Sequence, residues 1–331
     1  MNCRSIRFCV IVLCFVALPL SWHIPAHSAA APVKTVIGYA TVTARLMPLW
    51  IAHEQGIFAK YGIDAQPILI RGAPTLVAGL ASGDIHIGRT GGSAMLAAVA
   101  AGHDFKFVAS FSSRNTYDLV VRPNIKRAED LRGKRFAVTS IGGTTWMGIL
   151  LWLEHLGLDQ QRDQIQMQVV GDQGIQADGA FSRKLQQKGM TILHEYTEMT
   201  KLLAGQSMVV PGALLKQKSD LAENYLKAEI EALAYSLAPK NKPAVIKSLM
   251  RHLRTDAAGA EDGYLDLTRG VDRKPIPSIE GLRNVQRLLK TRTPKVGDLK
   301  VEDVIDGRIA RRLDESGFIE RTFATHGASL K

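Results

Sequence analysis

Short apolar segments alternate with amphipathic stretches along the first half of the chain, and this alternation limits the fold more than any other feature. Residues 34–39 predict a buried strand, residues 49–60 a helix and residues 64–70 the next strand. Residues 84–88 and 105–110 predict two more strands, again with helices before them. Strands that alternate with helices of about 10–15 residues form parallel sheets that are covered on both faces. We therefore expect an α/β fold.

The pattern continues further along the chain and then changes. Three more strands and one apolar helix are predicted, the strands at 118–123, 134–139 and 164–170 and the helix at 146–156. From about Met199 the chain is predicted to be mostly helical, with Pro243 and Pro277 at helix starts. Residues 291–299 are expected to form an exposed connector.

The first thirty residues predict a cleaved secretory signal peptide, residues 1–30. Arg4 and Arg7 precede an apolar run at 8–20, and small residues follow at 28–30. The apolar run is shorter than the roughly 20 residues that span a bilayer, although an uncleaved membrane anchor remains the alternative. We therefore expect a periplasmic protein.

All three cysteines lie inside this leader, at Cys3, Cys9 and Cys14. The remaining chain can form neither a disulfide nor a cysteine-based metal site. The formal net charge is +11 and falls to about +9 without Arg4 and Arg7. This surplus favours anionic solutes or acidic partners, or is only a solvated basic surface. Nucleic acid is not an expected partner, because aromatic residues make up only 6% and no binding motif occurs.

Three loops share one form, in which a strand ends, a small polar or glycine-containing segment follows and a helix begins. Free N–H groups at a helix start attract anions, and ligands of open α/β sheets lie beyond the carboxyl ends of the strands. Ser, Thr and Gly are also ordinary capping residues. The candidate ligand-binding residues in these loops are Thr41, Thr43, Arg45, Thr90, Gly91, Gly92, Ser93, Ser140, Gly142, Gly143, Thr144 and Thr145.

Arginines near strand ends are candidates for binding the carboxylate or sulfonate group of a ligand. Arg45 and Arg71 are the stronger candidates, and Arg89 and Arg114 are weaker. Any of them could equally be a surface residue. Tyr117 either lines the ligand site or packs between lobes.

Catalytic patterns are missing from the sequence. No HExxH motif or paired Cys/His spacing occurs, and Gly142-Gly143 lacks the spacing and the lysine of a P-loop. We expect no enzyme activity, no catalytic residue, no metal and no cofactor.

Three segments, 48–64, 79–102 and 119–159, carry a family resemblance by their order and spacing. Together they resemble the periplasmic substrate-binding proteins of ABC importers in the nitrate/sulfonate/taurine group, which includes the NMT1/THI5-like pyrimidine binders. The resemblance covers most of residues 33–200 and is looser in the C-terminal third.

The resemblance implies a bilobal periplasmic-binding-protein fold of type II, with two parallel or mixed sheets flanked by helices, a hinge and a cleft. It implies a first lobe at 31–117, a second lobe at 118–200 and a helical return at 201–331 that completes the first lobe. It adds Leu46 and Gly72 to the ligand-binding positions.

The function that the resemblance implies is capture of a small anionic solute, of sulfonate or carboxylate type, by a monomer. The solute would pass to an ABC permease in the inner membrane that works with a cytoplasmic ATPase. The alternatives are a binder of a pyrimidine or aromatic precursor, a solute sensor or scavenger, and an enzyme related to pyrimidine-precursor synthases.

Residues 171–180 depart from the family pattern. Roughly ten to twenty residues that would form a helix and a strand are missing, and the short remnant cannot form a stable helix, since even 12 residues are marginal. We expect a shortened second lobe, with impaired binding as an alternative outcome.

Overall fold

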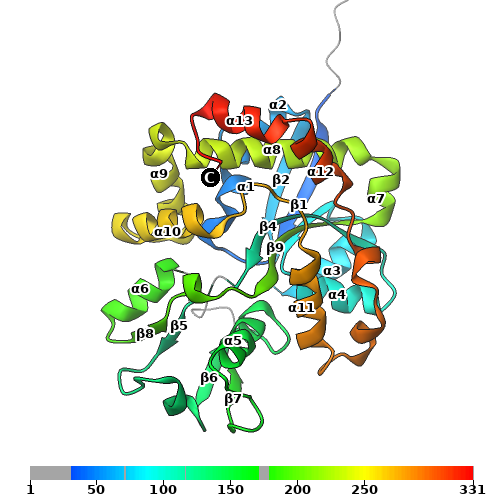
Figure 1. Ribbon diagram of the computed structural model, residues 1–331. Coiled ribbons are helices and arrows are strands. Elements are labelled where there is room, and N and C mark those ends of the chain that lie inside the picture. Colours follow the sequence, from blue (N-terminus) through cyan, green and yellow to red (C-terminus); the bar gives the residue numbers. More distant parts are fainter. Residues whose placement is uncertain (1–30, 71, 116, 171–178, 331) are drawn as a thin grey trace, which may run out of the picture. The chain divides into compact units, whose positions relative to one another are not determined.

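The largest sheet contains five strands in the order β2-β1-β3-β9-β4 (Figure 1). The computed structural model describes residues 31–70, 72–115, 117–170 and 179–330. The strands are β1 Val33–Tyr39, β2 Ile63–Leu69, β3 Ile87–Thr90, β4 Phe105–Arg114, β5 Leu119–Val121, β6 Arg135–Val138, β7 Gln166–Val169, β8 Thr191–His194 and β9 Leu202–Pro211. β1 pairs in parallel with β2 and β3, whereas β9 runs antiparallel between β3 and β4. The sheet is therefore mixed.

Helices cover both faces of this sheet. The α-helices are α1 Met47–Glu54, α2 Ile57–Lys60, α3 Ala73–Ser82, α4 Gly92–Ala100, α5 Thr144–His155, α6 Gly179–Gln187, α7 Gly212–Gln217, α8 Ser219–Leu237, α9 Lys242–Leu253, α10 Ala257–Gly270, α11 Ile279–Leu289, α12 Arg308–Glu315 and α13 Phe318–His326. The 3-10 helices are η1 Ala44–Leu46, η2 Ala128–Leu131, η3 Tyr196–Glu198, η4 Pro239–Asn241, η5 Pro294–Asp298 and η6 Val301–Val304. Among the described residues, no helix combines the length and the apolar character that a membrane span requires.

Two hydrophobic cores lie on opposite faces of the sheet, and β9 contributes to both. Met208 and Val210 belong to the core that includes α1 and α8, and Val209 belongs to the core that includes α4 and α11. Side chains of a strand point alternately to its two faces. All three are fully buried, so β9 is a central strand with both faces covered.

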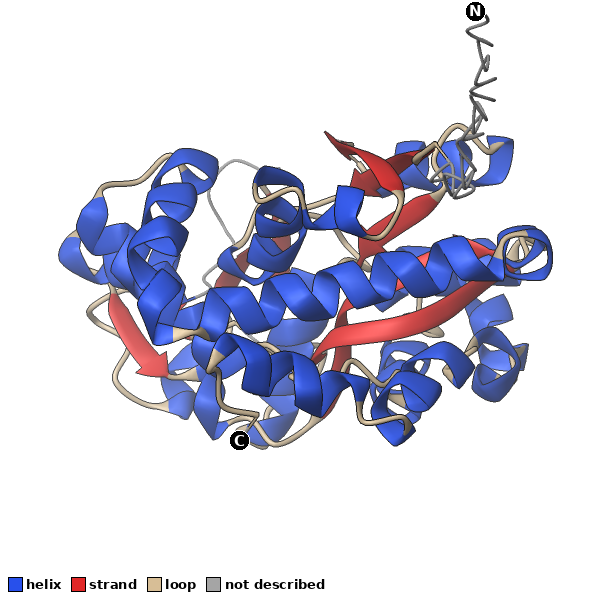
Figure 2. Cartoon of the chain, turned by 90° about the horizontal axis from the view of Figure 1, so that it is seen from above, coloured by secondary structure: helices blue, strands red, loops and turns tan. Residues whose placement is uncertain are grey.

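A buried ion pair joins the sheet to α8, the 19-residue helix that runs along the top of Figure 1 and across Figure 2. Nε of Arg89, on β3, lies 3.0 Å from a carboxylate oxygen of Glu229, and both side chains are fully buried. Tyr225 donates a hydrogen bond to Glu229, and the guanidinium of Arg89 lies 3.9 Å from the ring centre of Phe111. Burial raises the pKa of the Glu229 carboxyl, and the charge of Arg89 opposes that rise.

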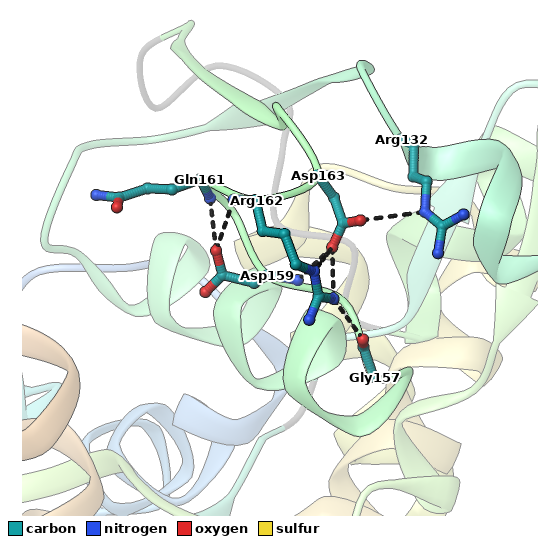
Figure 3. Close-up of polar contacts among 6 residues, drawn as sticks. All are labelled: Arg132, Gly157, Asp159, Gln161, Arg162 and Asp163. Carbon is teal, nitrogen blue, oxygen red and sulfur yellow. Dashed lines mark hydrogen bonds and ion pairs between the residues drawn. The ribbon is translucent and has the colours of Figure 1, made fainter.

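The strands between β4 and β9 form two small sheets, an antiparallel pair β5-β8 and a parallel pair β6-β7. A turn held by two aspartates leads from α5 into β7 (Figure 3). Asp159 accepts hydrogen bonds from the backbone N–H groups of Gln161 and Arg162, and Asp163 accepts from the side chains of Arg132 and Arg162. The Arg162 guanidinium lowers the pKa of the Asp163 carboxyl. This turn fixes α5 against β6 and β7.

Several sequence predictions need correction. The chain after Met199 is not mostly helical at first, because it begins with the ten-residue strand β9. The predicted helix at 49–60 is interrupted, since Gly56 adopts a left-handed conformation with φ of 68° between α1 and α2. The strand predicted at 84–88 starts only at Ile87. The predicted exposed connector at 291–299 contains η5, whose Val296 is fully buried.

Two predictions fall outside the described residues. These are the signal peptide at 1–30 and most of the shortened segment at 171–180. The boundaries of the two lobes also stay a prediction.

We expect Glu229→Gln to lower the free energy of unfolding by about 3–5 kcal/mol, because it leaves the buried Arg89 charge without its partner. Glu223→Gln, on the same helix, is the matched control, since Glu223 pairs with Lys227 and Arg312 nearer the surface. It should cost at most about 1 kcal/mol. Urea denaturation of both variants measures the difference, and equal losses would contradict a special role for the buried pair.

Candidate functional site

Two of the three predicted loops meet in the structure. A Cβ atom placed on Gly91, which precedes α4, would lie 3.2 Å from the side chain of Thr144 at the start of α5. The same atom would lie 3.1 Å from the carbonyl oxygen of Gly205 on β9. The absence of a side chain at Gly91 therefore allows the close approach of α5.

Strand β9 also contacts the loop that follows β1. The side-chain amide of Gln206 donates a hydrogen bond of 3.0 Å to the hydroxyl of Thr41. The next residue, Ser207, pairs with Thr90 at the end of β3. The loops at Thr41 and at Thr90–Gly91 thus contact β9 directly, and the loop before α5 contacts Gly91 through Thr144. We call Thr41, Gly91, Thr144 and Gln206 the loop cluster.

The loop before α5 is shaped by its glycines. Gly142 has φ of 80°, and a Cβ on Gly143 would overlap the Ser140 hydroxyl. The backbone N–H of Gly143 donates to the Ser140 carbonyl, and the Thr145 hydroxyl accepts from the backbone N–H of Thr139. This loop places the N-terminus of the 12-residue helix α5 beside Gly91.

Other predicted site residues are buried or have close packing contacts. Leu46 and Ser93 are buried, and a Cβ on Gly92 would lie within about 3 Å of Ala204 and Leu282. The Thr43 hydroxyl is buried and has no hydrogen-bond partner among the described residues. Gly92 is therefore better explained as a packing position between α4, β9 and α11.

Two of the predicted arginines form ion pairs within the protein. Arg45 is buried, forms an ion pair with Asp266 on α10 and lies 5.5 Å from the ring centre of Tyr196. Arg89 pairs with Glu229 as described above, so carboxylates of the protein itself neutralise both charges. Arg71 lies outside the described residues.

The two remaining predicted residues are Gly72 and Tyr117. Gly72 is exposed, with φ of 94°. Tyr117 is half-buried, and its carbonyl accepts a hydrogen bond of 2.8 Å from the indole N–H of Trp152. This contact supports the packing interpretation of Tyr117.

A cavity of about 540 Å³ adjoins the loop that carries Arg45. Tyr196 and Gly270 line it, and both contact Arg45. The charged residues in its lining are Arg114, Arg269, Asp272, Arg273 and Lys274, and the others are Ser113, Val271, Ile276, Ser278 and Leu330. Among the described residues, Arg114 is the one candidate from the sequence analysis in this lining, and it is one of the weaker candidates.

Two of the four cations at the cavity have partners within the protein. Lys274 forms an ion pair of 2.8 Å with Asp314, and Arg273 donates hydrogen bonds to the carbonyls of Thr268 and Ser329. Arg114 acts electrostatically on Asp272, where its charge opposes the rise in the pKa of that carboxyl, and Arg269 is exposed. With four cations and one carboxylate, the lining of the cavity carries an excess of positive charge.

One carboxylate also lines the cavity. Asp272 accepts hydrogen bonds from the side chain and the backbone of Ser113, and burial raises the pKa of its carboxyl. Sequence reasoning missed Asp272, Tyr196 and Arg269. The dense charges at 269–274 were the one local signal that could have drawn attention to this segment.

The described residues contain no group of three or more His, Cys, Asp or Glu side chains arranged to hold a metal ion.

We expect a disulfide to form between cysteines introduced by Gly91→Cys and Thr144→Cys, because bonded cysteines place their Cβ atoms about 3.5–4.5 Å apart. The chain beyond residue 14 has no other cysteine, so mass spectrometry of the oxidised protein reads the bond directly. Gly56→Cys with Thr144→Cys is the control, since nothing lies within 4 Å of a Cβ at Gly56. Free thiols in the first pair would contradict the contact.

Comparison with known proteins places the chain in a family. Residues 43–241, more than half of the chain, match the model of the family described as NMT1/THI5 like. Over 133 residues the chain is 34% identical to the taurine-binding periplasmic protein of Escherichia coli (strain K12). This match covers 39% of the chain and 40% of that relative, so it spans well under half of the relative's length.

Solved structures share the fold at low sequence identity. A protein from Bordetella bronchiseptica RB50 matches with a TM-score of 0.70 at 17% identity, over 86% of this chain and 98% of that one. The periplasmic aliphatic sulphonate binding protein of Escherichia coli matches with a TM-score of 0.66 at 20% identity, over 83% and 92% of the two chains. The chain has the bilobal periplasmic-binding-protein fold, and it belongs to the NMT1/THI5-like family.

Proposed function

We propose that this protein is a periplasmic solute-binding protein that captures a small anionic organic solute and delivers it to an ABC permease. The fold and the family support this proposal. So do two similar proteins, which are named for binding taurine and aliphatic sulphonates. The expected solute has a sulfonate or carboxylate head group.

The cavity beside Arg45 is the observation that carries the proposal. Its volume of about 540 Å³ falls within the range of about 300–1,000 Å³ that is usual for small-molecule sites. Four cationic side chains and only one carboxylate line it. Because cations outnumber carboxylates in this lining, the cavity favours an anionic solute.

Binding alone accounts for this function. A solute that contacts both sides of a hinge stabilises the closed form over the open form, and no covalent step is required. Arg114 ends β4, the strand from which the chain leaves the large sheet, and Tyr196 lies shortly before β9, the strand by which it returns. A solute in the cavity would therefore contact both connections at once.

An aromatic solute is a second candidate, because the ring of Tyr196 lines the cavity. Its phenol hydroxyl is buried and has no hydrogen-bond partner among the described residues. A pyrimidine or an aromatic carboxylate could stack on the part of the ring that lines the cavity.

We expect a small organic anion to raise the melting temperature of residues 31–331 by several degrees. A ligand at 100 times its dissociation constant adds about 2.7 kcal/mol to the free energy of unfolding. The panel contains taurine, alkylsulfonates, aromatic carboxylates, nitrate and pyrimidines, each at equal ionic strength. The uncharged sulfonamide of each sulfonate is the control. A sharp transition that no anion shifts, or that only the uncharged analogues shift, would contradict the proposal.

A further inference from the structure

Strand β7 is one strand of a two-stranded sheet and has a neighbour on one side only. That neighbour is β6, beside which β7 lies at the bottom of Figure 1. Gln166, Gln168 and Val170 are exposed, and so is Val169, whose exposed fraction of 54% is the largest of any large hydrophobic residue in the described part of the chain. The strand is therefore open to solvent along most of its length.

The outer side of β7 carries free backbone groups. Gln166 and Val170 donate their backbone N–H groups to carbonyls on or next to β6. In a parallel pair, alternate residues bond the neighbouring strand, so Met167 and Val169 direct their N–H and C=O groups away from β6. These groups have no hydrogen-bond partner among the described residues. The outer side of β7 thus presents two donors and two acceptors to a further strand.

The edges of the large sheet are protected, in contrast. In β2, the Gly62 carbonyl and the Ile70 N–H bond the β1 segment, so Pro67 stands at an outward-facing position, where it offers no N–H group. The edge of β4 is covered by the segment that contains Asp272 and Pro275, which bond its backbone. Proline, charged side chains and a covering segment are the usual means of keeping a strand edge from pairing with another chain.

Strand β7 has none of these protections among the described residues. Residues 164–170 contain no charged residue and no proline, and their backbone has no covering segment among the described residues. A second copy of the same strand matches this edge, because two neutral strands meet without repulsion between like charges. A two-fold axis would also present the same donors and acceptors from both sides.

We propose that β7 pairs antiparallel with β7 of a second copy of this chain, about a two-fold axis beside Gln168. In this register Met167 of each copy lies opposite Val169 of the other, and the two residues exchange both backbone hydrogen bonds. All the outward groups of Met167 and Val169 are then used. A register centred on Met167 would instead oppose Val169 to Ile165, whose N–H already donates to the carbonyl of Gln160.

The side chains fit the same register. Gln168 faces its own copy across the axis, and a side-chain amide both donates and accepts hydrogen bonds. Met167 and Val169 meet on the other face as an apolar pair. So short a strand buries less surface than a stable dimer needs, which makes the association weak. The monomer expected from the family resemblance is then the form at low concentration. No residue of β7 lines the cavity beside Arg45, so solute binding stays available in both forms.

Single cysteines test the register in residues 31–331, which contain no other cysteine. Gln168→Cys should form a disulfide between two copies, because opposite residues of this kind have Cα atoms about 4.5 Å apart, within the range of a disulfide. Gln166→Cys is the matched control, since it is exposed on the same face but would lie about 14 Å from its own copy. Non-reducing electrophoresis after mild oxidation should show covalent dimer formation at least about tenfold faster for Gln168→Cys. Equal rates, or no dimer from Gln168→Cys, would overturn the pairing.

Sedimentation equilibrium tests the association without a cysteine. The average mass of the wild-type protein should rise towards that of a dimer between about 10 µM and about 1 mM, as a small interface allows. Val169→Lys should abolish the rise, since it places two like charges at the edge. Leu265→Lys is the control, because it makes a similar change at another exposed apolar residue, on α10, and should keep the rise. Both variants should melt as cooperatively as the wild type. A wild-type protein that stays monomeric, or an equal loss in both variants, would contradict the proposal.

These results are independent of the proposed function. A monomeric protein that binds an anionic solute would overturn the β7 pairing and leave the solute-binding function intact. A dimer of the stated register that binds no solute would do the reverse.

Discussion

The antiparallel insertion of β9 between β3 and β4 is the constraint on which the rest of the structure depends. Consecutive residues of this one strand reach two of the loops: Gly205 and Ser207 lie beside Gly91 and Thr90, and Gln206 donates a hydrogen bond to Thr41. Met208 and Val209 point into opposite cores. A shift of one residue would turn each side chain to the wrong face. The core packing of β9 therefore fixes the positions of the loop cluster.

Local patterns predicted the first half of the chain well because its structure is locally determined. Strands β1 and β2 and the glycine loop before α5 follow directly from apolar runs and turn residues. Strand β9 was missed for a physical reason. A strand buried on both faces shows no alternation of polar and apolar residues. The hydrophobic pattern of its sequence therefore does not distinguish it from a buried helix. Its partners, β3 and β4, are about a hundred residues away.

The site was harder to predict than the fold because charge compensation is not local. Arg45 has the position of an anion receptor at a strand end, yet its partner Asp266 stands 221 residues further along the chain. Burying an arginine without a carboxylate is too costly for a stable core. Each buried arginine therefore implies a distant acid that no local pattern reveals. Arg114 and Arg269, in contrast, are exposed where they line the cavity.

The segment after α10 explains why charged side chains gather at one place. It runs along β4, the edge strand of the large sheet, where Asp272 donates its N–H to Phe111 and Pro275 accepts from Ser110. An uncovered edge would expose unpaired backbone groups to other chains. By covering that edge, the segment also brings Asp272 beside Arg114, at the point where the chain leaves the sheet. Edge protection and the charges of the cavity thus come from the same residues, so a change that loosens this segment should affect stability and solute binding together.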